Sequence, residues 1–176
     1  MLKSSKPILL VAGDPKSVFL EIFFKSFKIQ KFKNPLILIV SEKILMEQMK
    51  ALKHKFKINK IEFNQINSKS LNNKRINFID IPFNKKLVSQ YIDLSFEVAL
   101  LLLKKNNKIS LINGPINKKK ILKKKFLGIT EYLAKKTNKK NYAMLIYNEK
   151  LSVSPITTHL PIRQIPKKIK HKEIIN

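Results

Sequence analysis

Two short runs of continuously apolar residues constrain the fold of this chain most strongly. Ile8 to Ala12 reads ILLVA, and the segment NPLILIVS covers 34–41. Strands that face solvent on one side alternate apolar and polar residues, whereas strands covered on both faces are apolar throughout. Both runs therefore predict strands that lie inside a sheet with helices on both of its faces.

Segments with helical spacing separate the strands that the sequence predicts. The apolar spacing predicts helices over 16–27, 42–52 with Ser41 as its cap, 86–107 and 129–137, and a last one near Pro161. Further strands are expected at 56–63, 75–83, 108–113, 142–147 and 151–156. This alternation predicts a layered α/β/α fold with a mainly parallel sheet, in which 1–176 forms a single α/β unit.

Three unusual turns follow predicted strands. They are Gly-Asp-Pro at 13–15, Gly-Pro at 114–115 and Thr-Thr-His at 157–159. Ligands of parallel α/β sheets bind beyond the carboxyl ends of the strands, so the fold predicts a site near these turns. His159 can be read in two ways there, as part of a tightly structured turn or as a metal or substrate ligand.

The positive charge of the chain invites a nucleic-acid hypothesis. The formal net charge is +26, but all 37 basic residues except Arg75 and Arg163 are lysines, spread along the whole chain. Long-range attraction to phosphate follows from such a charge. Base readout and planar phosphate clamping favour arginine, however. Abundant Asn and Ile accompany the lysines, so the composition favours drift over a nucleic-acid face.

Composition also excludes several classes of site. The chain has no cysteine, which rules out disulfides and thiolate metal sites and fits a cytoplasmic location. The apolar runs at 8–12 and 98–105 are too short to cross a bilayer. Three glycines cannot form a glycine-rich nucleotide loop, and the aspartates are scattered, so no acid/base pair is visible and no catalytic residue is assigned.

Four segments, in order, resemble the 4-hydroxythreonine-4-phosphate dehydrogenase family of pyridoxal phosphate biosynthesis. They are GDP at 13–15 with Glu21 beyond it, NGPINK at 113–118, GITEYLA at 128–134 and ITTHLPIRQI at 156–165. The resemblance covers only the N-terminal half of the family. It implies the first half of an isocitrate/isopropylmalate dehydrogenase-like fold.

The resemblance also implies a chemistry. In the family, a divalent metal (zinc, magnesium or cobalt) held by three histidines binds the hydroxyl and amino groups of a phosphorylated small-molecule substrate. NAD takes a hydride from the hydroxyl carbon, and the resulting β-keto acid loses its carboxyl group. The site lies between two lobes and draws on a second subunit, so a homodimer is implied.

Residue by residue, the resemblance assigns three positions. His159 matches a metal ligand of the family, and Asn117 and Lys118 match its substrate-contacting pair. Lys118 would meet anionic groups as a point charge. The alternative for Lys118 is an ordinary solvated lysine, because lysines surround it in the basic segment 118–125.

The sequence also departs from the family. Ile129 stands where the resemblance expects a metal-ligating histidine, and 16–20 lacks the family's further glycines. His54 and His171 match no missing ligand and are expected to be exposed. Three fates remain open. The chain is a fragment of an enzyme whose second half is a separately encoded, complementing polypeptide or lies beyond this chain, a degenerate homologue, or a non-catalytic basic binding protein for phosphorylated or polyanionic ligands.

Overall fold

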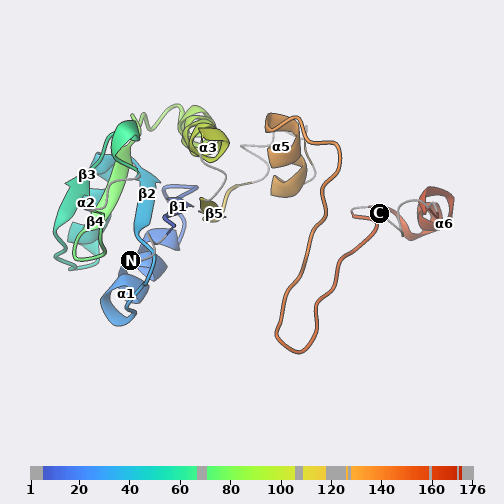
Figure 1. The fold of residues 1–176 in the computed structure, drawn as a ribbon. Coiled ribbons are helices and arrows are strands. Elements are labelled where there is room, and N and C mark those ends of the chain that lie inside the picture. The colour runs from blue at the N-terminus through green and yellow to red at the C-terminus, as the bar shows by residue number, and fades with distance from the viewer. Residues whose placement is uncertain are drawn as a thin grey trace. The chain divides into compact units, whose positions relative to one another are not determined.

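The computed structural model describes residues 6–66, 71–105, 109–117, 126, 128–158, 160–169 and 171. The chain divides into two compact units, Met1–Ile121 and Leu122–Asn176. Figure 1 shows the elements of each unit. The interpretation of 1–176 as one α/β unit of the family stays a prediction.

The first unit is built on a five-stranded parallel sheet. Its strands are β1 (Ile8–Val11), β2 (Leu36–Val40), β3 (Ile58–Lys60), β4 (Ile76–Asp80) and β5 (Ser110–Asn113). Their order across the sheet is β3-β4-β2-β1-β5. The predicted parallel sheet is therefore confirmed, and the two apolar runs occupy its centre.

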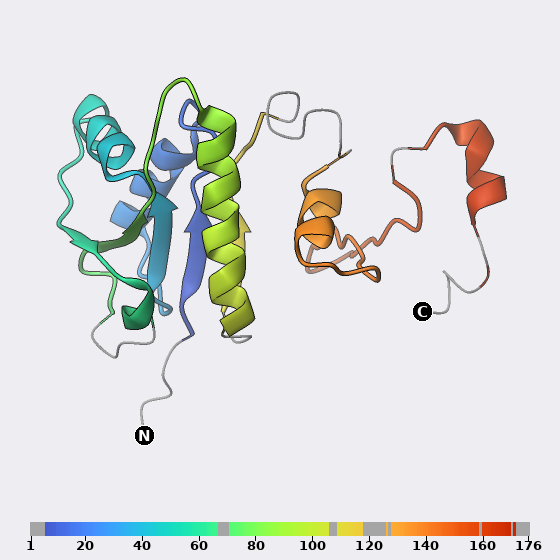
Figure 2. The same cartoon turned by 90° about the horizontal axis from the view of Figure 1, so that it is seen from above.

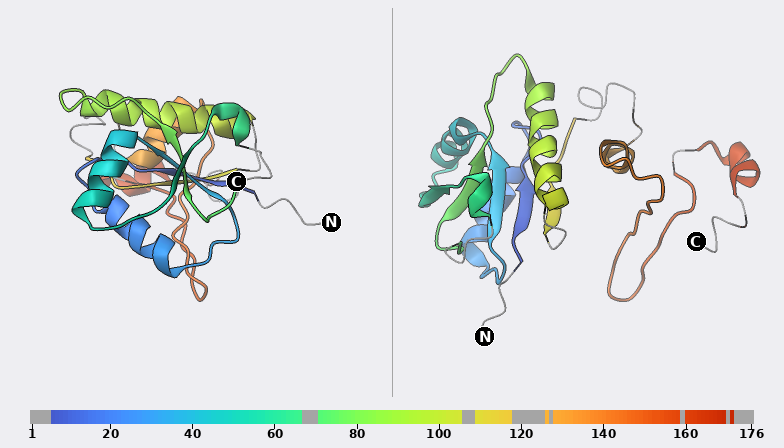
Figure 3. Two further views of the ribbon diagram at one scale, coloured as in Figure 1. Left: turned by 90° about the vertical axis from the view of Figure 1, so that its left-hand side faces the viewer. Right: turned by 45° about the horizontal axis from the view of Figure 1, so that its top comes forward.

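Helices cover both faces of this sheet. Helices α1 (Phe19–Ile29) and α2 (Glu42–Ala51) lie on one face, and α3 (Val88–Lys105) lies on the other, as Figures 2 and 3 show. Strands β1 and β2 are almost wholly inaccessible, which is what their unbroken apolar sequences predict. The layered α/β/α architecture is thus confirmed for the first unit.

The core of the first unit is largely apolar, and its buried polar residues are Ser41, Asn77 and Ser95. Its largest fully buried side chains include Phe24, Phe78, Phe96 and Leu38. Asn77 is buried among them, and its amide nitrogen donates to the backbone oxygens of Leu36 and Asn72. Buried amides without partners are costly, so these bonds make Asn77 compatible with the core.

Two details of the first unit differ from expectation. Helix α1 begins at Phe19 rather than at residue 16, because residues 14–17 form a hydrogen-bonded turn first. His54 was expected to be exposed, and this is wrong: its ring is half-buried, 5.5 Å from the rings of both Phe24 and Phe56. The aromatic neighbours explain the burial, since a histidine ring packs well on phenylalanine faces.

The second unit contains little regular structure among its described residues. Its helices are α5 (Ile129–Lys136), the short 3-10 helix η2 (Ile162–Gln164) and the single-turn α6 (Ile165–Lys168). The predicted strands at 142–147 and 151–156 are wrong as strands, because the structure has only an isolated antiparallel bridge between Ile146 and Val153. A strand needs a hydrogen-bonded neighbour along its length, and neither segment has one here.

None of the described helices is both long enough and apolar enough to span a membrane. His171 is exposed, as the sequence predicts.

Candidate functional site

The turns after β1 and β5 meet at the carboxyl edge of the sheet. The Asp14 N–H donates to the Pro115 carbonyl at 2.9 Å, and the Gly114 N–H donates to the Val11 carbonyl at 2.7 Å. Two of the three turns singled out in the sequence are therefore neighbours. They lie at the topological switch point of the sheet, where β1 has β2 on one side and β5 on the other. Open α/β sheets bind ligands at this point.

Glycine is required on both sides of this contact. Gly13 has φ +77°, and a Cβ built on it would lie 2.4 Å from the Pro115 oxygen. A Cβ on Gly114 would lie 2.4 Å from the Ala12 oxygen and 2.8 Å from the Phe19 ring. The backbones of the two turns thus approach closely because neither glycine has a side chain.

The first turn closes without the further glycines that the resemblance expects. The Ser17 N–H donates to the Asp14 carbonyl, and the Lys16 N–H donates to the Asp14 Oδ1 atom at 3.0 Å. Asp14 is half-buried at this edge. The aspartate side chain therefore holds the turn that leads into α1, a common use of Asp at turns.

One of the two predicted substrate contacts can be placed. Asn117 lies three residues after Gly114, in an exposed position. Lys118 falls outside the described residues, as does the basic segment that follows it. Asn117 therefore follows the β5 turn closely in the sequence, and it is accessible. A substrate-contacting amide is expected at this carboxyl edge of the sheet.

A charged cluster that the sequence did not reveal lies at the other side of the same edge. The Lys60 ammonium contacts the Asp80 Oδ2 atom at 2.6 Å and the Glu42 Oε2 atom at 3.2 Å. The Asp80 Oδ1 atom accepts the Glu42 N–H at 2.9 Å. Asp80 therefore caps α2, a role that was predicted for Ser41, whose side chain makes no such bond.

Two groups in this region have shifted pKa values. Partial burial raises the pKa of Asp80, but the Glu42 backbone N–H and the Lys60 ammonium favour the carboxylate and bring the pKa below its ordinary value. Burial raises the pKa of Tyr91 to about 12. The Tyr91 hydroxyl accepts the Ser41 N–H at 3.2 Å. Both groups stabilise the start of α2, so they are read as structural.

Two of the family-like segments lie against each other in the second unit. The Thr158 hydroxyl donates to the Glu131 Oε1 atom at 3.4 Å, which joins the GITEYLA helix to the ITTHLPIRQI segment. The Glu131 Oε2 atom is buried and has no hydrogen-bond partner among the described residues. A buried carboxylate oxygen without a donor is costly, so this position favours a further donor or a cation.

The predicted metal ligand itself cannot be placed. His159 lies outside the described residues, next to the half-buried Thr158. Ile129, at the start of α5, offers no donor atom. Among the described residues no group of three His, Cys, Asp or Glu side chains could hold a metal ion. The described donor set therefore does not make a three-ligand metal centre.

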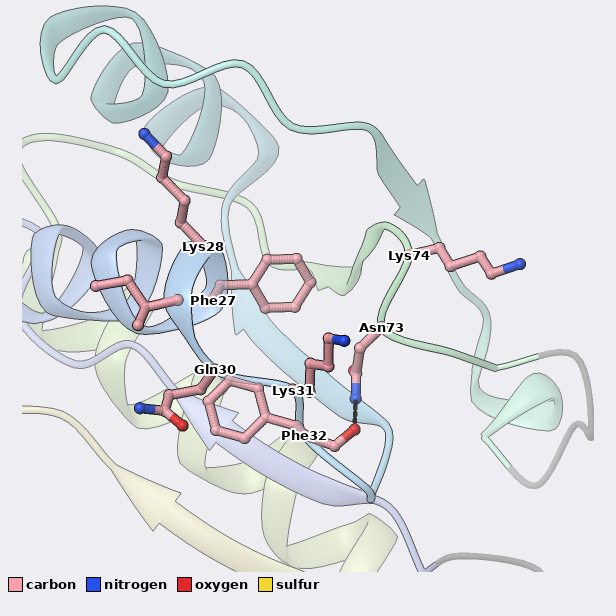
Figure 4. A pocket seen from close by; sticks show the side chains of 8 residues that line it. Phe27, Lys28, Gln30, Lys31, Phe32, Asn73 and Lys74 are labelled. Atoms are coloured by element: carbon pink, nitrogen blue, oxygen red, sulfur yellow. Dashed lines mark hydrogen bonds between the residues drawn. The ribbon is translucent and has the colours of Figure 1, made fainter.

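A hollow of about 400 Å³ lies away from these turns, at the end of α1. Its lining includes Phe27, Phe32, Asn73 and three exposed lysines, Lys28, Lys31 and Lys74. Figure 4 shows Lys28 and Lys74 extending away from each other. Asn73 bonds to the Phe32 and Asn34 carbonyls and to the Leu36 N–H. The lysines do not converge, so the hollow shows no arrangement for an anionic ligand.

Comparison with solved structures defines the class of protein. The chain is similar to the crystal structure of a 4-hydroxythreonine-4-phosphate dehydrogenase from Klebsiella pneumoniae, with 25% sequence identity and a TM-score of 0.81 over 97% of this chain and 56% of that one. The fold is that of the isocitrate dehydrogenase-like α/β proteins. Within that class, the chain belongs to the family described as pyridoxal phosphate biosynthetic protein PdxA, whose model matches residues 31–176.

Curated relatives agree with this family. The 4-hydroxythreonine-4-phosphate dehydrogenase of Aquifex aeolicus is 31% identical over 97% of this chain and 55% of its own length. The D-threonate 4-phosphate dehydrogenase of Pectobacterium atrosepticum is 27% identical over 91% of this chain and 53% of its own. The chain thus spans about half the length of the curated relatives that it matches.

Proposed function

We propose that this chain is the N-terminal half of a truncated or degenerate 4-hydroxythreonine-4-phosphate dehydrogenase, completed by a second-half polypeptide. The family match over 31–176 carries the proposal. It gains support from the contact between Thr158 and Glu131, which brings together two segments that resemble the family. The reaction would be NAD-dependent oxidation of 4-phosphooxy-threonine in pyridoxal phosphate biosynthesis.

The substrate would be a phosphorylated small molecule. The names of the Aquifex aeolicus and Pectobacterium atrosepticum relatives both denote 4-phosphates. Asn117 would donate a hydrogen bond from its amide, and Lys118 would neutralise an anionic group of the substrate. Asn117 is supported by its exposed place after the β5 turn.

The implied cofactors are NAD and a divalent metal. His159 would contribute one metal ligand, and the Thr158–Glu131 contact would hold the residue before it. NAD, when bound, would accept the hydride from the substrate's hydroxyl carbon. Because the described donors do not complete a metal centre, the remaining ligands would come from the second-half polypeptide or from a second subunit of a homodimer.

A coupled assay tests the activity. The chain is incubated with NAD, a divalent metal and 4-phosphooxy-threonine, alone and after co-expression with the second-half polypeptide. We expect NADH to form only with both polypeptides. D-threonate 4-phosphate, tested in parallel, separates the two substrates. The absence of NADH from the reconstituted pair with either compound would show that the chain is degenerate.

Metal binding has a readout independent of activity. Cobalt(II) absorption is titrated for the reconstituted pair with the native chain, with His159→Ala and with the control His171→Ala. We expect His159→Ala to weaken cobalt affinity by about 10- to 100-fold or more, and His171→Ala to leave it unchanged. Equal affinity in all three would remove His159 from the ligand set.

The alternative is a basic protein that binds phosphorylated or polyanionic ligands without catalysis. The net charge of +26 is the feature that suggested it. The lysines around the hollow extend away from one another, so they do not form a binding site that would support this alternative. A steep loss of affinity for single-stranded DNA with rising salt would support it. A cytoplasmic location, expected from the cysteine-free sequence, also stays a prediction.

A further inference from the structure

The segment 142–156, called here the apolar hairpin, exposes a concentration of large apolar side chains. They lie between 37% and 72% exposed and are Tyr142, Met144, Leu145, Ile146, Tyr147, Leu151, Val153 and Ile156. Figure 1 shows this segment as a long extended loop that follows α5. Scattered exposed apolar residues are ordinary, but a contiguous group of this size marks an interaction surface.

The backbone of the apolar hairpin is only partly paired. Ile146 and Val153 exchange two N–H···O bonds of 2.8 and 2.9 Å, and the Asn148 N–H donates to the Leu151 carbonyl at 3.1 Å. No other backbone bond joins the two arms among the described residues. Each arm therefore presents strand-like backbone that a neighbouring strand can pair with.

The sequence of the first arm is that of a fully covered strand. Ala143 to Tyr147 reads AMLIY, apolar at every position, like β1 (ILLV) and β2 (LILIV). Both of those strands have a partner on each edge and helices on each face. Among the described residues of its own unit, the first arm has only the Ile146–Val153 bridge to the second arm, and its large side chains stay exposed. Its sequence thus fits an environment that the described residues of its own unit do not supply.

We propose that the apolar hairpin is the docking surface for the second-half polypeptide of the family. This inference rests on the proposed function and names the surface through which the two halves would join. A partner that covers the exposed faces and the open edge of the first arm must provide strands and helices together. The region of the Aquifex aeolicus relative beyond the 55% that matches is long enough to contain such a layer.

The edge of the first unit supports the same occupant. Strand β5 ends the described sheet, pairs only with β1 and leaves Ile112 50% exposed. Edge strands that carry exposed branched apolar residues are open to a further strand. A second copy of this chain would bring another such hairpin and a sheet whose faces its own helices already cover, so it fits the two open surfaces less well.

Hydrogen exchange tests the docking directly. The full chain is co-expressed with a tagged polypeptide that comprises the unmatched second part of the Aquifex aeolicus relative, and the copurified pair is compared with the chain alone. We expect amides of 144–147 and 151–153 to exchange at least about tenfold more slowly in the pair. Amides of Leu9 to Val11 serve as the internal control, slow in both samples.

A matched pair of variants tests the side chains. Leu145→Lys with Ile146→Lys changes residues that are 62% and 59% exposed in the hairpin. The control, Ile22→Lys with Leu101→Lys, changes residues that are 57% and 55% exposed on α1 and α3. We expect the hairpin variant to lose copurification by about tenfold or more and the control to retain it. Unchanged thermal unfolding of each chain alone shows that both variants fold.

Several results would overturn the inference. They are failure of the two polypeptides to copurify, copurification without protection of 142–156, and equal loss in both variants. A chain that sediments alone as a dimer with a protected hairpin would assign the surface to a second copy instead. If the hairpin is protected in a pair that forms no NADH, the docking surface is supported and the proposed activity is contradicted. If the pair forms NADH while the hairpin stays unprotected, the proposed activity is supported and the docking surface is contradicted.

Discussion

Gly13 and Gly114 hold the turns after β1 and β5 in direct backbone contact. A Cβ on Gly13 would lie 2.4 Å from the Pro115 oxygen, and one on Gly114 would lie 2.4 Å from the Ala12 oxygen. The close approach of the two turns therefore requires glycine at both positions. Together the turns form the carboxyl edge at which the candidate site lies.

Alanine at either glycine should destabilise the first unit. Gly114→Ala forces its Cβ into backbone, and Gly13→Ala adds the strain of a positive φ. We expect a loss of about 1–3 kcal/mol in the free energy of unfolding for each. Urea unfolding measures this, with Lys43→Ala on the exposed face of α2 as the control. Because both changes disturb the same contact, the double variant should lose less than the sum of the two.

Asp80 should make the stability of the first unit depend on pH. Its folded-state pKa is lowered by the Glu42 N–H and the Lys60 ammonium, although burial opposes this. Its stabilising contribution is therefore complete above the unfolded pKa of about 3.9 and is lost as pH falls through the folded value. We expect Asp80→Asn to flatten the fall in urea midpoint below about pH 4. Glu149→Gln, on an exposed carboxylate, should leave the profile unchanged.

Tyr91→Phe removes a buried hydroxyl that supports the start of α2. The change removes the hydroxyl that accepts the Ser41 N–H and leaves that buried donor without its partner. We expect a loss of about 1–3 kcal/mol in the free energy of unfolding at neutral pH. Tyr147→Phe, which removes a hydroxyl from a residue that is 72% exposed, should be neutral.

The same tyrosine predicts a response to alkaline pH. Burial raises the folded pKa of Tyr91 to about 12, above the unfolded value of about 10. The neutral phenol therefore stabilises the fold fully below about pH 10, and this stability is lost as pH rises toward 12. Tyr91→Phe should unfold less steeply over that interval when ellipticity is followed. Equal slopes in the two proteins would contradict the assignment.

Asn73 should be important for the connection between α1 and β2. Its side-chain amide bonds to the Phe32 and Asn34 carbonyls and accepts the Leu36 N–H. Asn73→Ala should cost about 1–3 kcal/mol, because it leaves these backbone groups without partners. Asn73→Asp should also destabilise, since a carboxylate replaces the donor that faces two carbonyl oxygens. Chemical denaturation measures both, with the exposed Asn141→Ala as the neutral control.

The first unit followed from its sequence because its strands are short and unbroken. The unbroken apolar sequences of Ile8 to Ala12 and 34–41 predict covered strands, and the glycine turns after β1 and β5 mark the carboxyl edge. What the sequence could not show was long-range pairing. Asp80 rather than Ser41 caps α2, and Lys60 joins two carboxylates from separate elements. Their position at the carboxyl ends of parallel strands is the signal that points to such a cluster.

The second unit was less predictable because its described residues offer few of the neighbours that its apolar sequence favours. The apolar arms at 142–147 and 151–156 have the composition of strands, but a strand forms only where another pairs with it. The Thr158–Glu131 contact was suggested only indirectly, by two motifs of one family occurring in order. The apolar sequence of the hairpin thus predicts a covered environment, but it does not predict the conformation of the hairpin in the described structure.

The pairing of β1 with β5 has a consequence for how the chain is made. The first strand leaves the ribosome early, yet its partner on one side is the last strand of the sheet to be synthesised. Until then, one edge of β1 stays open to intermolecular pairing. Translation speed between the codons of β1 and those of β5 should therefore influence how much of the nascent protein escapes aggregation.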